Sequence, residues 1–420
     1  MHRHNWRMYC GFLLAAECLA QSAGAPHAIT WQEAQNRFRA NNPALLAGQV
    51  AVEEARAEET TAFLRPNPNL TVGADQLTPL HNTPYQPVAQ SYLFWSINYL
   101  HEREHKRDLR LASARQGTGI AESEQSDLTR NLLFSLRDAF VRVLLAKAVE
   151  GVAKENLDSY DKALAIHRDR YNAGAIARVD FERMELQRVQ FVSDLAIAQV
   201  NLRTAKIDLQ ALLRDRTPVD AFDVTEKFDY SEPAVTLEDL RAAALQNRPD
   251  LKAAEQSVDK AQTDHRLAVA NGSSDPVFGF DVAHQPTPLN TYLGFNINFP
   301  LRIFDKNQGE KARTSLDIGR TQKLRDASEV TALHDVDAAY AALESTLALL
   351  RPYKSQYLPE AENVRSTISF SYEHGSASLL DFLDAQKEYR ATQLSYVNLI
   401  GAYLSAVNQL NFAVGQEVIP

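Results

Sequence analysis

Two stretches of the chain are nearly alike, and they decide the fold. Residues 30–57 read TWQEAQNRFRANNPALLAGQVAVEEARA, and residues 236–263 read TLEDLRAAALQNRPDLKAAEQSVDKAQT. Each stretch predicts a short helix, a break at Asn-x-Pro and a longer amphipathic helix. The chain therefore reads as an internal duplication, and both copies should have the same order of elements. Identical residues recur at one constant offset, namely Asn41/Asn247, Pro43/Pro249, Leu45/Leu251, Ala47/Ala253, Val52/Val258 and Ala55/Ala261.

Each copy continues into two segments in which apolar and polar residues alternate. They begin at Pro68 and Ser91 in the first copy and at Pro276 and Thr291 in the second. Side chains of a strand point alternately to opposite faces, so each segment has one apolar and one polar face. Each pair predicts a β-hairpin, at about 68–100 and at about 276–300. Strands of about ten residues with one apolar face have the length that crosses a bilayer at a tilt.

Two long helical stretches follow each hairpin. No proline lies between Pro87 and Pro218, and residues from about 101 to 171 are predicted to form one helix, about 105 Å long. In the second copy, Pro352 and Pro359 predict a break in the corresponding helix. Apolar residues spaced 3-4-3 predict coiled-coil seams, at Leu133, Leu136, Phe140 and Val143 and at Leu394, Val397, Gly401 and Leu404.

The N-terminus resembles a secretory signal over residues 1–22, because Arg3 and Arg7 precede the apolar residues 8–16. Both cysteines, Cys10 and Cys18, lie in this segment. The mature chain would then have no cysteine for a disulfide or a thiolate metal site. The expected organisation is a first repeat at 23–214, a linker or equatorial segment at 215–235, a second repeat at 236–416 and a C-terminal tail at 417–420.

Composition and strand number restrict the class of protein. The 420 residues carry a formal net charge of −9, so no large nucleic-acid surface is expected. No apolar run reaches about 18 residues, which argues against a transmembrane helix. Four strands cannot close a membrane barrel, which needs about eight or more, and an open sheet in lipid would leave unpaired edges. The predicted fold class is therefore an α+β membrane protein, a trimeric 12-stranded β-barrel with four strands per chain, continued by a long α-helical coiled-coil tunnel.

At this point the sequence resembles the TolC-like outer-membrane efflux family, over about residues 29–416. The resemblance rests on the duplicated Asn-x-Pro helix starts, the two strand pairs and the Tyr-x-x-Gly turns followed by acidic residues. Residues 299–310, FPLRIFDKNQGE, are similar to the CzcC-type branch, which is linked to resistance–nodulation–division (RND) pumps that export divalent heavy metals. One departure is residues 100–104, LHERE, where a Pro-containing turn would be usual.

The resemblance implies a homotrimer with its barrel in the lipid of the outer membrane and its helical tunnel in the periplasm. It implies docking onto a periplasmic adaptor (a membrane fusion protein) and an inner-membrane RND pump. It implies no enzyme activity and no cofactor. The expected function is the outer-membrane channel of a tripartite efflux system for divalent heavy-metal cations.

The helix tips far from the membrane are the expected constriction. Asp381 and Asp384 are three residues apart and share a helix face. Under threefold symmetry they would form two rings of carboxylates that attract cations. The resemblance puts constriction aspartates at these positions and makes Tyr372 part of the network that holds the tip shut. An ordinary solvated acidic helix face is the alternative, and whether the rings bind a metal ion stays open.

The first copy has a matching tip. Tyr171, Gly174 and Asp180 correspond to Tyr372, Gly375 and Asp381. Arg178 or Glu182 is expected to supply charge pairs there. Glycine at both turns suits a helix C-terminus in the left-handed conformation.

Residues 101–105, HEREH, match the zinc-protease pattern H-E-x-x-H. The motif follows a predicted strand within a highly charged stretch, so it reads as a solvated helix start rather than a metal site. His81, His167, His284, His334 and His374 are each expected at the surface, with His374 the one to test for metal contact. Two alternatives stay open: a drug, solvent or type I secretion channel of the same fold, and a soluble periplasmic coiled-coil adaptor.

Overall fold

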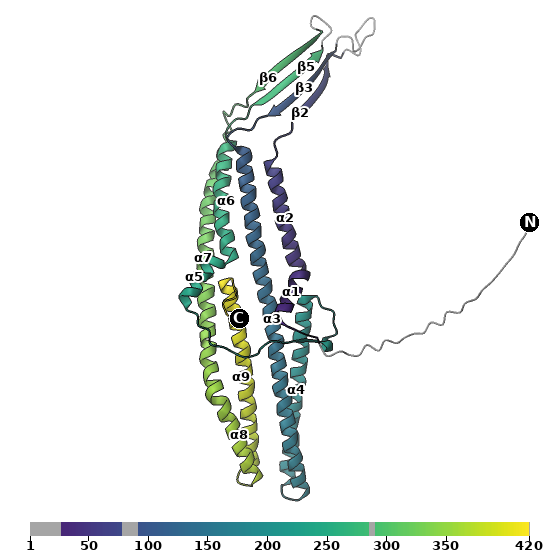
Figure 1. Ribbon diagram of the computed structural model, residues 1–420, viewed down its shortest axis with the longest axis vertical. Helices are drawn as coiled ribbons and strands as arrows, with labels where there is room; N and C mark the ends of the chain where they lie inside the picture. The colour runs from purple at the N-terminus through teal and green to yellow at the C-terminus, as the bar shows by residue number, and fades with distance from the viewer. Residues whose placement is uncertain (1–26, 78–90, 285–289, 420) are drawn as a thin grey trace, which may run out of the picture.

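The chain is a long rod with helices along its axis and a small sheet at one end (Figure 1). The computed structural model describes residues 27–77, 91–284 and 290–419. Helix α3 (Lys106–Asn172) has 67 residues, which corresponds to about 100 Å. The predicted signal segment and His81 lie outside the described residues.

The first half of the chain forms a sheet hairpin and one long helical hairpin. The predicted long helix begins later than expected, at Lys106, because Glu104 and His105 take the left-handed backbone conformation. The elements in order are β1 (His27–Ile29), α1 (Trp31–Asn41), α2 (Pro43–Phe63), β2 (Asn69–Asp75), β3 (Tyr92–Leu100), α3, α4 (Arg178–Leu213), the 3-10 turn η1 (Val219–Ala221) and β4 (Phe222–Val224).

The second half repeats the order of helices and long strands, but its described residues have no counterpart of β1, η1 and β4, and its first long helix contains a π turn. The predicted helix break at Pro352 is wrong. The backbone stays helical there, through a five-residue π turn, η2 (Tyr353–Tyr357). A π turn accommodates the missing N–H of a proline without ending the helix. The elements are α5 (Leu237–Asn247), α6 (Pro249–Asn271), β5 (Val277–His284), β6 (Thr291–Asn298), α7 (Gln308–Pro352), η2, α8 (Leu358–Glu373) and α9 (Leu379–Val414).

The break before each proline is present, but the two breaks are stabilised differently. Asn42 accepts hydrogen bonds from the N–H groups of Ala44 and Leu45, at 2.9 and 3.1 Å, and so caps α2. The corresponding Arg248 makes no such cap. Its buried guanidinium instead pairs with Asp250 at 2.6 Å and with Asp335 at 2.9 Å. The second break is therefore tied to α7 by an ion pair.

Four strands form one antiparallel sheet in the order β2-β3-β5-β6. The central pair β3 and β5 joins the two halves, with Trp95 opposite Val282 and Ile97 opposite Phe280. A second, parallel sheet of β1 and β4 was not expected from the sequence. It places part of the polar segment 215–235 against residues 27–29 at the middle of the rod.

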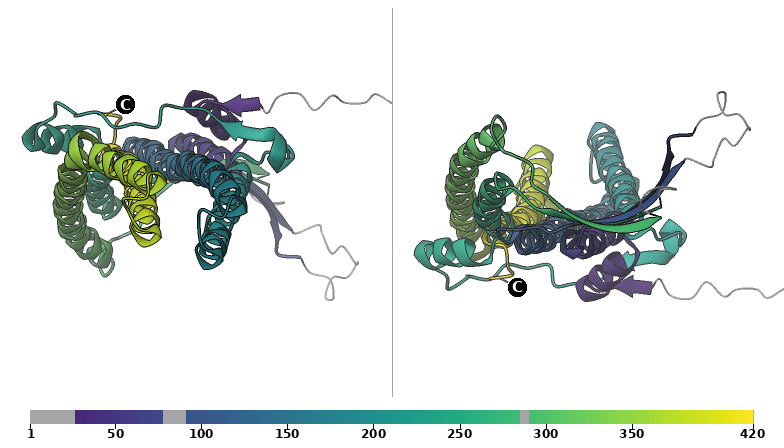
Figure 2. Two further views of the ribbon diagram at one scale, coloured as in Figure 1. Left: turned by 90° about the horizontal axis from the view of Figure 1, so that it is seen from below. Right: turned by 90° about the horizontal axis from the view of Figure 1, so that it is seen from above.

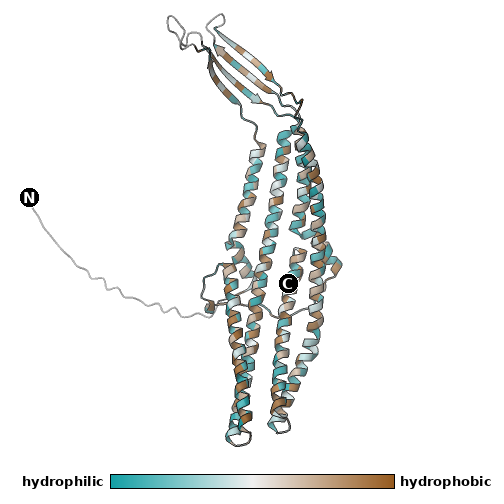
Figure 3. Cartoon of the chain, turned by 180° about the vertical axis from the view of Figure 1, so that it is seen from behind, coloured by the Kyte–Doolittle hydropathy of each residue, from teal (hydrophilic) through white to brown (hydrophobic). Residues whose placement is uncertain are grey.

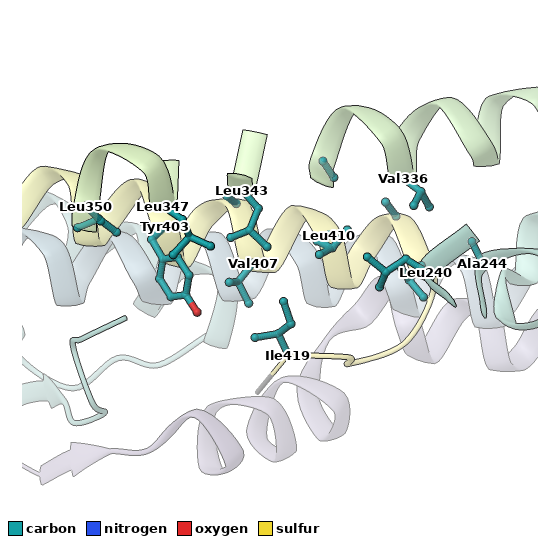
Figure 4. Close-up of a cluster of buried hydrophobic side chains, with 14 of the residues drawn as sticks. Leu240, Ala244, Val336, Leu343, Leu347, Leu350, Tyr403, Val407, Leu410 and Ile419 are labelled. Carbon is teal, nitrogen blue, oxygen red and sulfur yellow. The ribbon is translucent and has the colours of Figure 1, made fainter. Parts of the chain in front are cut away.

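Buried apolar residues form clusters along the lower part of the rod. One cluster gathers α5, α7, α9 and Ile419, so the predicted C-terminal tail is packed (Figure 4). A second joins α1, α3, α4 and the β1-β4 sheet, and it contains Leu136, Phe140 and Val143 of the predicted seam. The predicted seam of α9 is less regular, because Leu394 is 39% exposed.

The helices of the lower rod form one layer in the order α4, α3, α9 and α8. Helix α1, the β1-β4 sheet, the linker and α5 all cross one face of this layer (Figure 2). The four-stranded sheet curves with its concave side toward the opposite face (Figure 2). No helix within the described residues is both long and apolar enough to cross a membrane.

Candidate functional site

The two helical hairpins end side by side in turns of the same geometry. Gly174 and Gly375 have φ of +78° and +77°, and each donates its N–H to the carbonyl of the preceding tyrosine, Tyr171 or Tyr372. Only glycine takes this left-handed conformation without strain. The predicted turn positions are therefore confirmed, and each tyrosine lies in the last turn of its helix.

Asp381 holds the start of α9 in a reciprocal cap. Its carboxylate accepts hydrogen bonds from the N–H of Ser378 at 3.0 Å and from the hydroxyl at 2.7 Å. The Ser378 hydroxyl accepts the N–H of Asp381 in return. These bonds lower the pKa of the Asp381 carboxyl below its usual value, so it is ionised at neutral pH. Both Asp381 and Asp384 are exposed, while Phe382 between them is buried.

The first tip is built with a different charge arrangement. Ala177 precedes α4 and offers no side-chain cap. Arg178 pairs with Glu182 one turn further along, at 2.8 Å, and both side chains are exposed. The two charge-bearing residues expected at this tip therefore pair with each other within the chain. Such exposed pairs contribute little stability.

Aromatic stacking joins the two hairpins at the tips. Tyr372 of α8, 8% exposed, stacks on His167 of α3 with ring centres 5.0 Å apart and on Phe382 of α9 at 5.1 Å. Tyr171 stacks on Phe181 at 5.1 Å and closes the first hairpin. Burial raises the pKa of the Tyr372 hydroxyl, and the nearby Asp180 carboxylate raises it further. The charge of Asp180 in the first tip thus acts on the hydroxyl of Tyr372 in the second.

The expectation that His167 lies at the surface is wrong. It is 1% exposed, within the cluster of Leu164, Phe181, Met184, Tyr372, Leu379 and Phe382. Its Nδ1 lies 2.7 Å from the Ala163 carbonyl oxygen, and its Nε2 has no partner among the described residues. The 4-3 spacing of Tyr160, Leu164 and His167 places all three on one helix face, and this spacing indicates that His167 is buried. His334 and the tip residue His374 are not among the buried residues.

The H-E-x-x-H motif does not form a helical metal site. His105, the residue before α3, has a left-handed backbone conformation. His101 directly follows the last residue of β3. Glu102 pairs with Arg110 instead of a histidine partner. No group of three His, Cys, Asp or Glu residues that could hold a metal ion occurs in the described part of the chain. The motif was expected to form the start of the helix, but α3 begins only after it, at Lys106.

One face of the four-stranded sheet is apolar across all four strands. Two rows cross it, Val72–Trp95–Val282–Leu293 and Leu70–Ile97–Phe280–Phe295. All but Val282 are among the exposed large apolar residues of the chain. The opposite face carries polar residues, including Asp281, which accepts a hydrogen bond from Asn296 at 2.6 Å. Figure 3 shows hydrophobic and hydrophilic residues alternating along the strands.

The outer helices of the lower layer also carry apolar residues that no other described part of the chain covers. On α4, Val179, Leu186, Val200 and Ile207 are exposed at multiples of seven residues. On the other edge, Tyr357 and Val364 are exposed seven residues apart, along η2 and α8. Because α4 and α8 are the two ends of the layer, each end offers an apolar stripe to another molecule.

Comparisons with known proteins agree with these features. Residues 240–416 match the family described as "Outer membrane efflux protein". The cobalt-zinc-cadmium resistance protein CzcC of Cupriavidus metallidurans is 23% identical over 313 residues, 74% of each chain. The pyoverdine export outer membrane protein OpmQ of Pseudomonas aeruginosa is 24% identical over 89% of this chain and 82% of its own. The resemblance to outer-membrane efflux proteins, with CzcC among the relatives, is confirmed.

The fold is that of solved channel proteins. The crystal structure of CusC, which has been described in connection with transmembrane channel formation, aligns with a TM-score of 0.76 over 92% of each chain, at 18% identity. At this identity the likeness establishes the fold of the single chain.

The stacked tip makes a direct prediction. His167→Ala should leave a cavity between the hairpins and destabilise the tip by about 2–4 kcal/mol. His167→Phe should stay within about 1 kcal/mol of the native protein, because it keeps the stack and removes an unpartnered nitrogen. Hydrogen exchange of the α8 and α9 amides near the tip measures both effects. His374→Ala is the control, since His374 is exposed. Unchanged exchange in His167→Ala would show that the stack does not join the hairpins.

Proposed function

We propose that this chain is the outer-membrane channel component of a tripartite efflux system. The single observation that carries the proposal is the four-stranded sheet, which exposes one continuous apolar face and stands at the end of helices about 100 Å long. The match of residues 240–416 to the outer membrane efflux protein family supports the same function.

The sheet supports assembly from several copies. Within the chain, β2 and β6 are edge strands, and neither has a second partner among the described strands. In lipid, unpaired N–H and C=O groups of an edge are costly, so a membrane sheet closes into a barrel. Four strands are too few, whereas three copies would supply twelve. We therefore propose a homotrimer in which β2 of one copy pairs with β6 of the next.

The helical layer supports the same assembly. The stripe of Val179, Leu186, Val200 and Ile207 on α4 and the stripe on η2 and α8 lie at opposite ends of the layer. Joining one end to the other around a threefold axis buries both stripes and closes a tube. The tube would extend into the periplasm, where its tips would meet a periplasmic adaptor and an inner-membrane RND pump. This arrangement disfavours the alternative of a soluble adaptor, which has no use for the apolar sheet face.

The tips are the proposed gate. The exposed carboxylates of Asp381 and Asp384 would form rings of negative charge, which attract cations and repel anions. The stack of Tyr372 on His167 and Phe382 holds the two hairpins of one chain together. To open the tips, either this contact or the contact between neighbouring chains would have to break. Adaptor docking would drive the opening if the adaptor binds the open state more tightly than the closed state.

Two classes of cargo are supported by different relatives. Divalent heavy-metal cations are supported by the likeness to CzcC and by the acidic tips. Organic compounds are supported by the likeness to OpmQ, which covers more of the chain. We propose metal cations as the cargo because carboxylate rings favour cations, and organic compounds as the second candidate.

The trimer is tested by a charge in the α4 stripe. Leu186 is 71% exposed in the single chain and would be buried between copies, so Leu186→Arg should prevent assembly by placing an unpaired charge in an apolar interface. Light scattering of the detergent-purified protein measures the number of copies. Ile166→Arg is the matched control, because Ile166 is an exposed residue of α3, inside the layer rather than at its ends. A native protein that is a single subunit without detergent would refute the proposal.

The gate is tested by single-channel recording in planar bilayers. Asp381→Asn keeps an oxygen that can cap α9 but removes the charge, so with Asp384→Asn it should lower cation preference severalfold without changing the fold. Tyr372→Ala combined with Asp381→Ala should raise conductance, because it removes both the stack and the cap. Tyr372→Phe with Asp381→Asn should raise conductance less. Unchanged conductance and unchanged ion preference in all these variants would mean that the tips are not the constriction.

The cargo is tested in a strain that lacks the gene. We expect increased sensitivity to zinc, cadmium or cobalt, restored by the native gene and not by one carrying Leu186→Arg. Growth inhibition across a series of metals and organic toxicants measures the range of cargo. Sensitivity to organic compounds alone would overturn the metal assignment and leave the channel function in place.

A further inference from the structure

A cleft of about 660 Å³ opens between α3, α4 and α9. Its volume is within the range of small-molecule sites. The walls are mainly apolar, with Leu145, Val149 and Val152 from α3, Ile197 from α4 and Leu394 from α9. Leu394 was expected in a coiled-coil seam, and its 39% exposure arises because it lines this cleft instead.

The cleft contains a buried hydrogen-bond donor without an acceptor. Asn156 of α3 lines the cleft and is 8% exposed. Its side-chain nitrogen has no hydrogen-bond partner among the described residues. Buried polar groups in folded proteins nearly always have a partner. A ligand that carries a hydrogen-bond acceptor would supply one.

The charged residues of the cleft are already paired. Arg390 of α9 donates to Asp194 of α4 at 2.9 Å and lies over the Phe191 ring at 4.9 Å. The other oxygen of Asp194 accepts a hydrogen bond from Gln190 at 2.7 Å. Arg142 at the cleft pairs with Asp138 at 3.2 Å. The only carboxylate that lines the cleft, Asp194, is thus neutralised by an arginine, and the described lining offers no second one to hold a metal ion.

The cleft lies on the face of the helical layer away from the equatorial elements. On α3, Leu136, Phe140 and Val143 pack toward α1 and the β1-β4 sheet. Leu145, Val149 and Asn156 lie on the other side of the same helix, by the 100° rotation per residue. This is also the face toward which the four-stranded sheet is concave (Figure 2). In the proposed trimer it faces the lumen, so the cleft would be open to passing cargo.

We propose that this cleft binds an apolar organic molecule that carries a hydrogen-bond acceptor such as a carbonyl group. The acceptor meets the Asn156 side-chain amide, and the apolar body lies on Leu145, Val149 and Leu394. Binding itself follows from the single chain, whereas the statement that the ligand is cargo rests on the proposed function. The cleft therefore favours organic compounds at this height of the tunnel, in contrast to the carboxylates at the tips.

The test is fluorescence titration of the purified native assembly with two naphthalene probes. One is 6-propionyl-2-(dimethylamino)naphthalene, which has a carbonyl acceptor, and the other is 2-(dimethylamino)naphthalene, which lacks it. We expect saturable binding of the carbonyl probe. Asn156→Leu should weaken it about tenfold and leave the second probe nearly unchanged. Ala153→Trp and Ala391→Trp, which fill the cleft from opposite walls, should abolish saturable binding of both probes.

Asn131→Leu is the matched control, because Asn131 is an exposed residue of α3 outside the cleft. Circular dichroism and light scattering establish that each variant keeps the native fold and assembly. Equal affinity of both probes for native protein and Asn156→Leu would overturn the role of Asn156. Saturable binding that survives both tryptophan variants would overturn the cleft as the site. Native binding in a protein that forms no channel would leave the cleft in place and refute the proposed function, and a conducting channel without binding would do the reverse.

Discussion

The exposed apolar face of the four-stranded sheet is the constraint on which the rest of the structure depends. Its rows Val72–Trp95–Val282–Leu293 and Leu70–Ile97–Phe280–Phe295 form an apolar face, and none of the described helices packs broadly on the sheet. Exposed apolar area of this extent is unfavourable in water, at about 25 cal/mol per Å². Edge strands with free backbone groups add to the cost. A lipid environment and strand pairing between copies would remove both costs at once.

The helices of the lower rod also leave apolar residues exposed. The interior of the layer is well packed, with Leu136, Phe140 and Leu410 fully buried. The two end helices, α4 and α8, nevertheless expose stripes such as Val179, Leu186 and Val364. The inner strands are thus paired and the inner helices well packed, whereas the edge strands and end helices leave backbone groups and apolar side chains exposed. In the proposed trimer these exposed edges would be buried between neighbouring copies.

The tips and the cleft offer different chemistry along one path. At the tips, Asp381 and Asp384 expose carboxylates while the stack of Tyr372 and His167 joins the hairpins. Midway along the helices, the cleft is apolar and its charges are paired. In the proposed trimer, a tunnel with charge at its entrance and an apolar cleft beyond it would select by charge first and by shape and hydrogen bonding afterwards.

Periodicity in the sequence was sufficient to predict the local elements. The alternation in residues 91–100 and 291–299 predicted strands that the structure contains, and the glycines at 174 and 375 predicted turns with positive φ. These features are local, because they depend on the face to which each side chain points and on the backbone conformation that one residue allows.

Only the tertiary structure decided which distant residues meet. It buried His167 against Tyr372 and Phe382, packed Ile419 among the helices, paired residues 27–29 with 222–224 and left Leu394 and Asn156 around a cleft. The pattern of one segment carries no information on these contacts, because they depend on how helices far apart in the chain pack side by side. The sequence alone thus determined the four long strands, the long helices and the tip turns, whereas packing decided the short β1-β4 sheet, the buried clusters and the cleft.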